Sequence, residues 1–172
     1  VQLVSPDGVP STYDFLPGSE GLATNIKANC FSAAIVLDCA DLERTGPLAD
    51  EVVLASQIIN IDHHSTNTMF GTINWVEPKA AATAEMVLAL LQELNLPIDL
   101  EIATCLYTGI HTDTGGFKYA NTTPDVHRAA EMLLGIGVKP WYIADKVYNR
   151  KSLSQLQLIR LALERLQVGF KG

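Results

Sequence analysis

Long apolar runs, repeats and the common nucleotide-binding loops are all missing from this chain. No stretch comes close to the roughly 18 uncharged apolar residues that a transmembrane helix needs, so we expect no membrane span. The absence of a G-x-G-x-x-G turn and of a Walker lysine loop argues against a plain Rossmann or flavodoxin-type domain. Because Val1 to Ser5 contain neither an initiator Met nor a signal-peptide core, we expect the chain to begin inside a longer protein.

Cysteine and positive charge are also scarce. The three cysteines, Cys30, Cys39 and Cys105, have no short paired spacing, which favours buried free thiols in a reducing compartment and predicts a cytoplasmic protein. The chain has 12 Lys and Arg residues and 19 Asp and Glu residues. Its net charge of −7 argues against nonspecific binding to nucleic acid, which needs a basic surface. A phosphate substrate is still compatible, because acids gathered around divalent cations can form a locally positive site.

The chain does contain alternating short apolar runs and amphipathic segments. Apolar residues make up 48% of it and charged residues 18%, as in a globular domain with a real core. Short apolar runs at 33–37, 52–54 and 57–61 predict strands of a buried parallel sheet. We therefore expect an α/β fold with a mostly parallel sheet and helices on both faces.

Capping residues and apolar spacing predict helices in the rest of the chain. The expected helices cover 83–94, 99–109, 123–135, a short stretch after Pro140, and 152–169. The apolar segment 106–110 is compatible with helix or strand, and we expect it to lead into a loop from His111 to Gly116. His111 is interpreted as a loop residue without a ligand role.

Ligand-type residues stand at the ends of three apolar runs. They are Asp38, the tripeptide Asp62-His63-His64, and Asp113. Ligands of open α/β sheets bind beyond the carboxyl ends of the strands, where Asp38 and the tripeptide are expected. A buried acid there is costly unless it is paired or bound to metal. Carboxylates and imidazoles together suit a divalent ion such as manganese, zinc or iron, so the pattern favours a metal-centred hydrolase.

Three segments resemble the motifs of one family. The run from Asn60 to Gly71 reads NIDHHSTNTMFG and is similar to the signature of the DHH phosphoesterase family. Val36 to Asp41 resemble that family's second motif, and Gly109 to Phe117 its fourth. The match is closest to the branch that degrades very short RNA and dephosphorylates phosphoadenosine phosphate. The resemblance covers essentially the whole chain.

This resemblance implies a two-metal phosphoesterase site. Asp38 would bridge two ions, and His63 and Asp113 would complete one of them. Asp62 would orient ligands or touch the metal-bound water, and His64 would face the phosphate or support the site. The implied ion is manganese, with magnesium, cobalt or zinc as alternatives. The implied partners are short single-stranded RNA or a mononucleotide bisphosphate, and a homodimer is one option for the oligomeric state.

Two parts of the family pattern are missing from the sequence. The first motif, a His and two Asp residues, should lie before Val1, and the glycine-rich substrate-binding domain should follow the chain. We therefore expect residues 1–172 to be a single DHH-type catalytic domain that is truncated at both ends. Residues 152–172 should begin a linker helix toward the missing domain. Such a piece should hold at most one ion, weakly, and should be poorly active.

Two other functions stay open. An inorganic pyrophosphatase or polyphosphatase shares the Asp-His-His site, although the context Asn121-Thr122-Thr123 leans toward the nucleotide branch. A non-catalytic, nucleotide-binding regulatory module would keep the α/β scaffold without hydrolysing anything.

Overall fold

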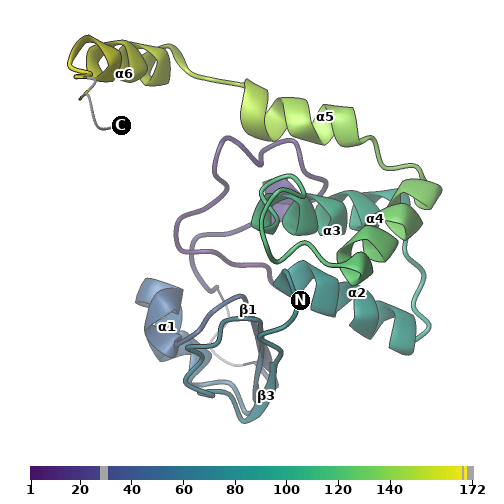
Figure 1. The fold of residues 1–172 in the computed structure, drawn as a ribbon. Helices are drawn as coiled ribbons and strands as arrows, with labels where there is room; N and C mark the ends of the chain where they lie inside the picture. Colours follow the sequence, from purple (N-terminus) through teal and green to yellow (C-terminus); the bar gives the residue numbers. More distant parts are fainter. Residues whose placement is uncertain (28–30, 168, 170–172) are drawn as a thin grey trace.

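A parallel sheet carries Asp38 and the tripeptide Asp62-His63-His64 at or just after the ends of its strands. The structure is a computed structural model that describes residues 1–27, 31–167 and 169, so Cys30 lies outside the described residues. Within these residues the sheet has three strands in the order β1-β2-β3. The strands are β1 (Ala34–Leu37), β2 (Ile58–Asp62) and β3 (Ile73–Val76) (Figure 1). Ala34 is paired with Ile58 and Ile59 with Ile73, so all three strands end at the same edge.

Helices cover the sheet from two sides. The helical elements are η1 (Ser19–Gly21), η2 (Leu42–Leu48), α1 (Ala49–Val52), α2 (Thr83–Glu93), α3 (Leu100–Asp113), α4 (Pro124–Ile136), α5 (Pro140–Ala144), η3 (Asp145–Asn149) and α6 (Leu153–Glu164). In Figure 1, α1 lies on one side of the sheet, and α2, α3 and α4 lie on the other. This arrangement confirms the α/β class with a parallel sheet.

Two buried apolar clusters hold the layers together. One lies among the helices and includes Leu106, Ile110 and Leu133. The other joins the sheet to η2 and α1 through Val36, Leu48, Val52 and Ile58. Burial of each such side chain contributes about 1.5–3 kcal/mol before entropy is counted. The helical cluster therefore fixes where α3 ends relative to the sheet.

Several element boundaries differ from those predicted. Residues 52–54 form the end of α1 and a turn instead of a strand, because only Val52 reaches the core while Val53 and Leu54 are exposed. Helix α3 continues past Gly109 to Asp113. A Cβ at Gly109 would lie 2.7 Å from the Cβ of Ala84, so this glycine permits close helix packing and is not a stop signal.

The last two long helices also end away from their predicted positions. Helix α4 extends to Ile136, and Gly137 ends it with a left-handed φ of 118°. Ser152 and Gln155 form the predicted capping box of α6, but that helix ends at Glu164, well before Gly169.

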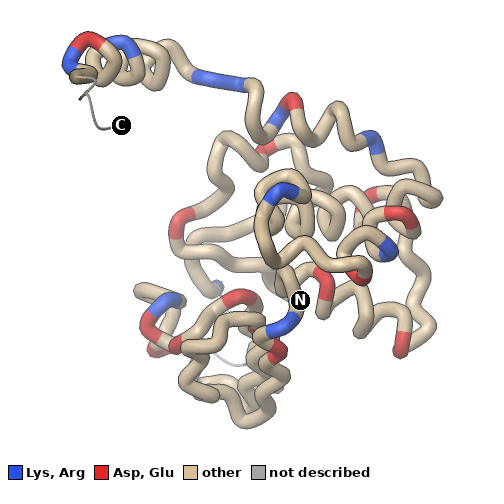
Figure 2. The backbone as a smooth tube through the Cα atoms, in the orientation of Figure 1, with Lys and Arg blue, Asp and Glu red and all other residues tan. Residues whose placement is uncertain are grey.

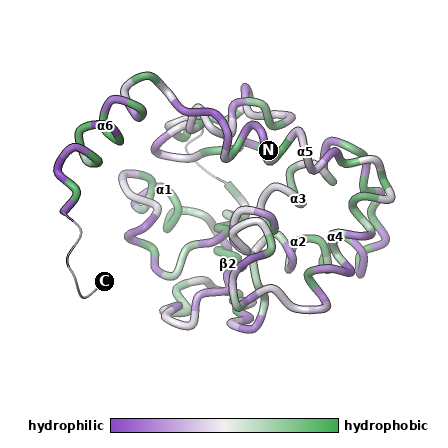
Figure 3. The backbone as a smooth tube through the Cα atoms, turned by 45° about the horizontal axis from the view of Figure 1, so that its top comes forward, coloured by the Kyte–Doolittle hydropathy of each residue, from purple (hydrophilic) through white to green (hydrophobic). Residues whose placement is uncertain are grey.

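Helix α6 stands apart from the rest of the molecule (Figure 1). Apolar and polar residues alternate along it (Figure 3), and side chains such as Leu153 and Leu158 are exposed. Its role as a linker helix stays a prediction. In the part of the chain that the structure describes, no helix is long and apolar enough to cross a membrane. Cys39 and Cys105 are free thiols, but both are half-buried and not fully buried as predicted.

Candidate metal centre

The carboxyl ends of β1 and β2 bring the candidate residues to one edge of the sheet. Asp38 directly follows β1, and Asp62 is the last residue of β2. The backbone N–H of Asp38 donates to the carbonyl of Ile61 at 3.0 Å, so strand pairing holds the two ends together. Asp38 has a left-handed φ of 59°. That conformation costs a non-glycine residue on the order of 1 kcal/mol, and such strain is often found at functional positions.

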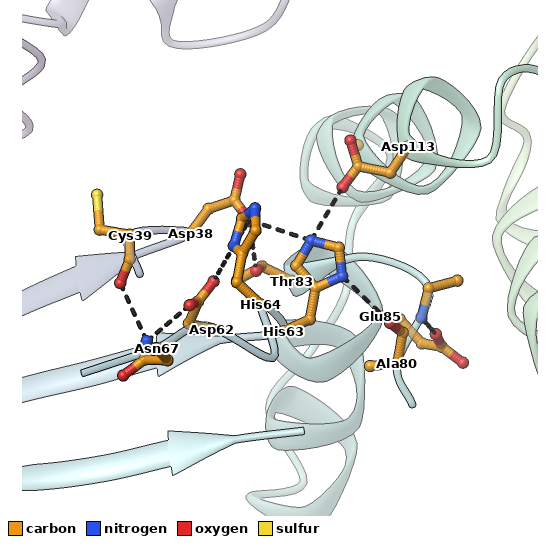
Figure 4. Close-up of polar contacts among 12 residues, drawn as sticks. Asp38, Cys39, Asp62, His63, His64, Asn67, Ala80, Thr83, Glu85 and Asp113 are labelled. Atoms are coloured by element: carbon orange, nitrogen blue, oxygen red, sulfur yellow. Dashed lines mark hydrogen bonds and ion pairs between the residues drawn. The ribbon is translucent and has the colours of Figure 1, made fainter. Parts of the chain in front are cut away.

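Four side chains converge beyond this edge (Figure 4). His63 Nε2 lies 3.4 Å from Asp38 Oδ1 and 3.8 Å from Asp113 Oδ2. His64 Nδ1 lies 3.9 Å from the same oxygen of Asp38. Metal–ligand distances of about 2.1 Å place neighbouring donors roughly 3.0–3.5 Å apart, so the first of these separations suits donors that share an ion.

The ring orientation of His63 supports the same interpretation. Its Nδ1 lies 3.1 Å from the carbonyl oxygen of Ala80. A carbonyl can only accept, so Nδ1 carries a proton and Nε2 faces Asp38 and Asp113. With a neutral ring, Nε2 and the two carboxylates are all donors to a cation, whereas a charged ring would pair with the carboxylates directly. A backbone carbonyl that fixes the tautomer of a ligating His is a common partner in metal sites.

Charge crowding is visible in the pKa of Asp113. Burial raises the pKa of this carboxyl, and the neighbouring Asp38 raises it further, while His63 and His64 act in the opposite direction. Thr83, the first residue of α2, donates its hydroxyl to Asp38 Oδ1 at 2.8 Å. Thr83 is thus the group that fixes the orientation of the Asp38 carboxylate.

Asp62 has a different setting, because it is fully buried. Its Oδ1 accepts from His64 Nδ1 at 2.7 Å, and its Oδ2 accepts from Asn67 Nδ2 at 2.6 Å. Burial acts to raise the pKa of Asp62, but the hydrogen bonds from Asn67 and His64 outweigh it, so the pKa lies below its ordinary value. Both oxygens are engaged, which favours an orienting role over direct metal ligation.

Two asparagines tie this carboxylate to the turn after β1. The Nδ2 of Asn67 lies 2.8 Å from Asn60 Oδ1 and 3.1 Å from the carbonyl of Cys39. Asn60 donates to the same carbonyl at 3.2 Å. The backbone N–H of Thr68 donates to the carbonyl of Ala40 at 2.7 Å. The segment after the two histidines is therefore fastened to the turn that carries Asp38.

Sequence reasoning found the converging acids and imidazoles but missed their supports. The structure brings Asp38, His63, His64 and Asp113 together and places Asp62 beneath them; their chemical roles stay predictions. The roles of these supports were missed because Thr83 looks like an ordinary helix start, Asn67 like a turn residue, and Asn60 like one polar position in a strand. The order N-x-D-H-H-x-x-N was a usable signal, since it brackets the acid with amides.

His111 is located differently from the prediction. It lies inside α3 and is buried, and neither ring nitrogen has a hydrogen-bond partner within the described structure. Its ring packs among those of Tyr107, Phe117 and Tyr148. Burial and the nearby Lys118 lower its pKa, so the ring is held neutral as an aromatic core residue.

The chain is similar in sequence to named proteins from several bacteria. The chain is 40% identical to the bifunctional oligoribonuclease and PAP phosphatase NrnA of Thermus thermophilus, over 95% of this chain and 49% of that protein. It is 26% identical to the protein of the same name from Bacillus subtilis, over 74% of this chain and 40% of that one. The chain thus spans about half the length, or less, of these relatives.

A solved structure and a family match lead to the same group. The crystal structure of an exopolyphosphatase-related protein from Bacteroides fragilis superposes with a TM-score of 0.87 at 29% identity, covering 98% of this chain and 53% of that one. Residues 4–110 match the N-terminal domain of the DHH family. With more than half of its residues inside that match, the chain belongs to the DHH family.

Proposed function

We propose that this chain carries the hydrolytic centre of a divalent-metal phosphoesterase. Its proposed substrates are short oligoribonucleotides or a mononucleotide bisphosphate such as phosphoadenosine phosphate. They correspond to the two activities in the names of the relatives from Thermus and Bacillus. Manganese is the proposed ion, because it accepts both carboxylate oxygen and imidazole nitrogen. The observation that carries the proposal is the convergence of His63 Nε2 on two carboxylates.

The donor set fits a divalent ion. Asp38, His63 and Asp113 would hold it, and Thr83 would keep the Asp38 carboxylate in place. A bound ion of this kind supplies Lewis-acid activation of water and neutralises charge on the phosphate. The chain's own contribution is to position these donors on two strand ends and one helix end.

His64 would act on the substrate phosphate. Its Nδ1–H donates to Asp62, which orients the ring and leaves Nε2 free. The side chain is 36% exposed, so a phosphate oxygen can reach it. In its neutral form Nε2 accepts a proton, and in its charged form it donates to a phosphate or leaving-group oxygen.

A second ion belongs to the proposal for the complete protein. Asp38 would be shared by both ions, because its second oxygen has no hydrogen bond assigned among the described residues. In the described residues, Asp38, His63 and His64 have donor atoms close enough to share one ion. We assign Asp113 in place of His64, because Asp113 Oδ2 lies 3.8 Å from His63 Nε2 while the Nδ1 of His64 is bonded to Asp62. With donors for one ion in view, we propose that residues 1–172 alone hold one ion weakly and hydrolyse poorly.

A substitution at Asp38 tests the function in the full-length protein. Manganese-dependent hydrolysis of a diribonucleotide should fall by several orders of magnitude in Asp38→Asn, on the order of 4–6 kcal/mol in barrier height. Asn is a fair replacement because it tolerates a left-handed backbone. Calorimetric titration with Mn²⁺ gives the second readout, and affinity should fall in Asp38→Asn and in His63→Gln. Equal hydrolysis rates and equal Mn²⁺ affinities would refute the proposal.

A substrate panel separates the alternatives. Faster turnover of pyrophosphate or polyphosphate than of the diribonucleotide would assign the site to the polyphosphatase type. Nucleotide binding without hydrolysis of any substrate would favour the regulatory module. A dominant rate on the diribonucleotide or on phosphoadenosine phosphate supports the proposed function.

A further inference from the structure

The loop that follows Asp113 is folded back on itself and rigidly held. Gly115, Gly116 and Phe117 all have left-handed φ values, between 58° and 71°. The backbone N–H groups of Lys118 and Tyr119 both donate to the carbonyl of Thr114, at 2.9 and 3.0 Å. The turn therefore returns the chain toward α3 and presents the side chains after it near Asp113.

Tyr119 rests directly on this turn. A Cβ at Gly115 would lie 2.4–2.6 Å from three carbons of the Tyr119 ring, so the ring lies against a glycine two residues from Asp113. The tyrosine is nevertheless 61% exposed. A flat aromatic surface is thus held open to solvent beside a proposed metal ligand.

A second tyrosine comes from the far end of the chain. Tyr148, in η3, donates its hydroxyl to the carbonyl of His111 at 3.4 Å, and its ring lies 5.5 Å from the His111 ring. It is 40% exposed, and Lys118 Nζ lies 6.0 Å from the centre of its ring. Burial raises the pKa of Tyr148, and the nearby Tyr13, Tyr119 and Asp113 add to the rise, so the hydroxyl stays a donor.

Basic residues lie near these tyrosines although the whole chain is acidic. Lys118 is on the loop, and Arg150 and Lys151 are on the segment that leads to α6, where Figure 2 shows a stretch of Lys and Arg. Arg150 Nε lies 3.8 Å from Asp145 Oδ2, so this residue is already paired. Lys151 Nζ donates to the backbone carbonyl of Tyr148 at 3.4 Å, which keeps a second cation beside the backbone of that residue. Aromatic faces combined with cations are the usual surface for single-stranded nucleic acid.

We propose that Lys118, Tyr119 and Tyr148 form a nucleotide subsite, here called the tyrosine shelf. It would bind the nucleoside next to the phosphate held at the metal centre. The base would stack on a tyrosine ring, and Lys118 would pair with the following phosphate. The shelf presents hydroxyls and a cation around its rings, which suits RNA better than an apolar peptide. This inference rests on the proposed function and extends it to a specific subsite.

Kinetics of the full-length protein on a diadenosine ribonucleotide with Mn²⁺ test the shelf. Tyr119→Ala and Tyr148→Ala should each raise KM about tenfold, within the range of base–aromatic stacking, with kcat changed less than about threefold. The Phe variants at both positions should restore the wild-type KM, because the ring is kept. Lys118→Met should raise KM and flatten its dependence on salt.

Matched controls come from a similar pair elsewhere in the chain. Tyr142 is 37% exposed and has Lys146 Nζ 5.2 Å from its ring centre, but it packs against Phe15. Tyr142→Ala and Lys146→Met should leave KM unchanged. An abasic dinucleotide analogue, used as an inhibitor, should bind the wild-type protein and the Tyr→Ala variants equally. Thermal unfolding of every variant separates loss of the ring from loss of the fold.

The outcomes distinguish the shelf from the proposed function. If the wild-type protein is active and both Tyr119→Ala and Tyr148→Ala keep its KM, the shelf is refuted and the proposed function is not. Phe variants that fail to restore KM would also overturn base stacking. A changed oligomeric state in sedimentation, with KM unchanged, would assign the surface to a protein contact instead. A wild-type protein that neither hydrolyses the dinucleotide nor binds a fluorescein-labelled copy of it would overturn both.

Discussion

His63 and His64 are neighbours in sequence, but they belong to two halves of the site with opposite character. The open half comprises Asp38, His63 and Asp113. The side chains of its two acids are 52% and 38% exposed, the two carboxylates repel each other, and no Lys or Arg pairs with either of them among the described residues. The buried half is centred on Asp62, which is fully buried and accepts hydrogen bonds at both oxygens from Asn67 and from His64, whose ring extends from it toward solvent.

This difference indicates a division of labour. Groups that repel each other in the absence of an ion gain stability when a cation binds, so the open half should control metal affinity. A buried carboxylate whose oxygens are both hydrogen-bonded contributes to folding instead. The open half should therefore be sensitive to metal, and the buried half should determine whether the site forms at all.

The largest effect on stability is expected at Asp62. In the wild-type protein, both oxygens of Asp62 accept hydrogen bonds, one from His64 and one from Asn67. Asp62→Asn replaces one of these oxygens with an NH2 group, so one of the two donors loses its acceptor. Leaving such a buried donor unpaired costs about 1–3 kcal/mol, and more where a charge was involved. We expect the free energy of unfolding of the metal-free protein, measured with urea, to fall by about 3 kcal/mol.

Asp38→Asn is the matched comparison for Asp62→Asn. Its oxygen accepts from Thr83 alone among the described side-chain hydrogen-bond donors, and Asn fits its left-handed backbone. Its free energy of unfolding should change by less than about 1 kcal/mol while Mn²⁺ affinity collapses. Equal destabilisation by the two substitutions would refute the proposal that Asp62 supports the fold while Asp38 controls metal affinity.

A smaller effect is expected at Asn67. Asn67→Asp keeps the shape but sets a second carboxylate against Asp62 and loses the donor shared with Asn60. The unfolding free energy should fall by about 2 kcal/mol, and Mn²⁺ affinity by about tenfold as the turn carrying Asp38 loosens. Asn95→Asp is the control, because Asn95 is exposed and its amide donates only to the carbonyl of Glu93, two residues away. Similar losses in both variants would show a general effect of the added charge instead.

Local signals in the sequence were sufficient to predict much of this fold. The strands β1 and β2, with acids at or just after their ends, follow from short apolar runs. The helix starts at Asp99, Thr123 and Ser152 follow from caps whose side chains bond to the backbone three residues on. Each of these depends on residues that are close in sequence, which is why a single sequence reveals them.

Contacts between distant segments were beyond such reasoning. Thr83 is 45 residues from Asp38, and the Ala80 carbonyl is 17 residues from His63, so neither pairing has a local signal. Gly109 was interpreted as a helix end because its need for space comes from Ala84 on another helix. Asp113 was expected within the loop from His111 to Gly116 for the same reason, whereas it is the last residue of α3.

The smallest predicted effect concerns pH. The free energy of unfolding should depend on pH with opposite sign for Asp113 in the open half and Asp62 in the buried half. The raised pKa of Asp113 means that its charged form destabilises the metal-free fold, a penalty removed as pH falls and the carboxyl is protonated. The lowered pKa of Asp62 has the opposite sign. Its contribution is present above the ordinary Asp pKa of about 3.9 and is lost as pH falls through the folded-state value.

Asp113→Asn should consequently make the metal-free protein slightly more stable at pH 7, by less than about 1 kcal/mol because the exposed carboxylate is screened. The gain should vanish at about pH 3, where the wild-type carboxyl is protonated too. Saturating Mn²⁺ should reverse the order, since only the wild-type protein gains the full binding energy. Urea unfolding at both pH values, with and without Mn²⁺, measures all three differences. A variant that is less stable than wild type without metal would mean that Asp113 supports the fold directly, and the open half would then not be the strained one.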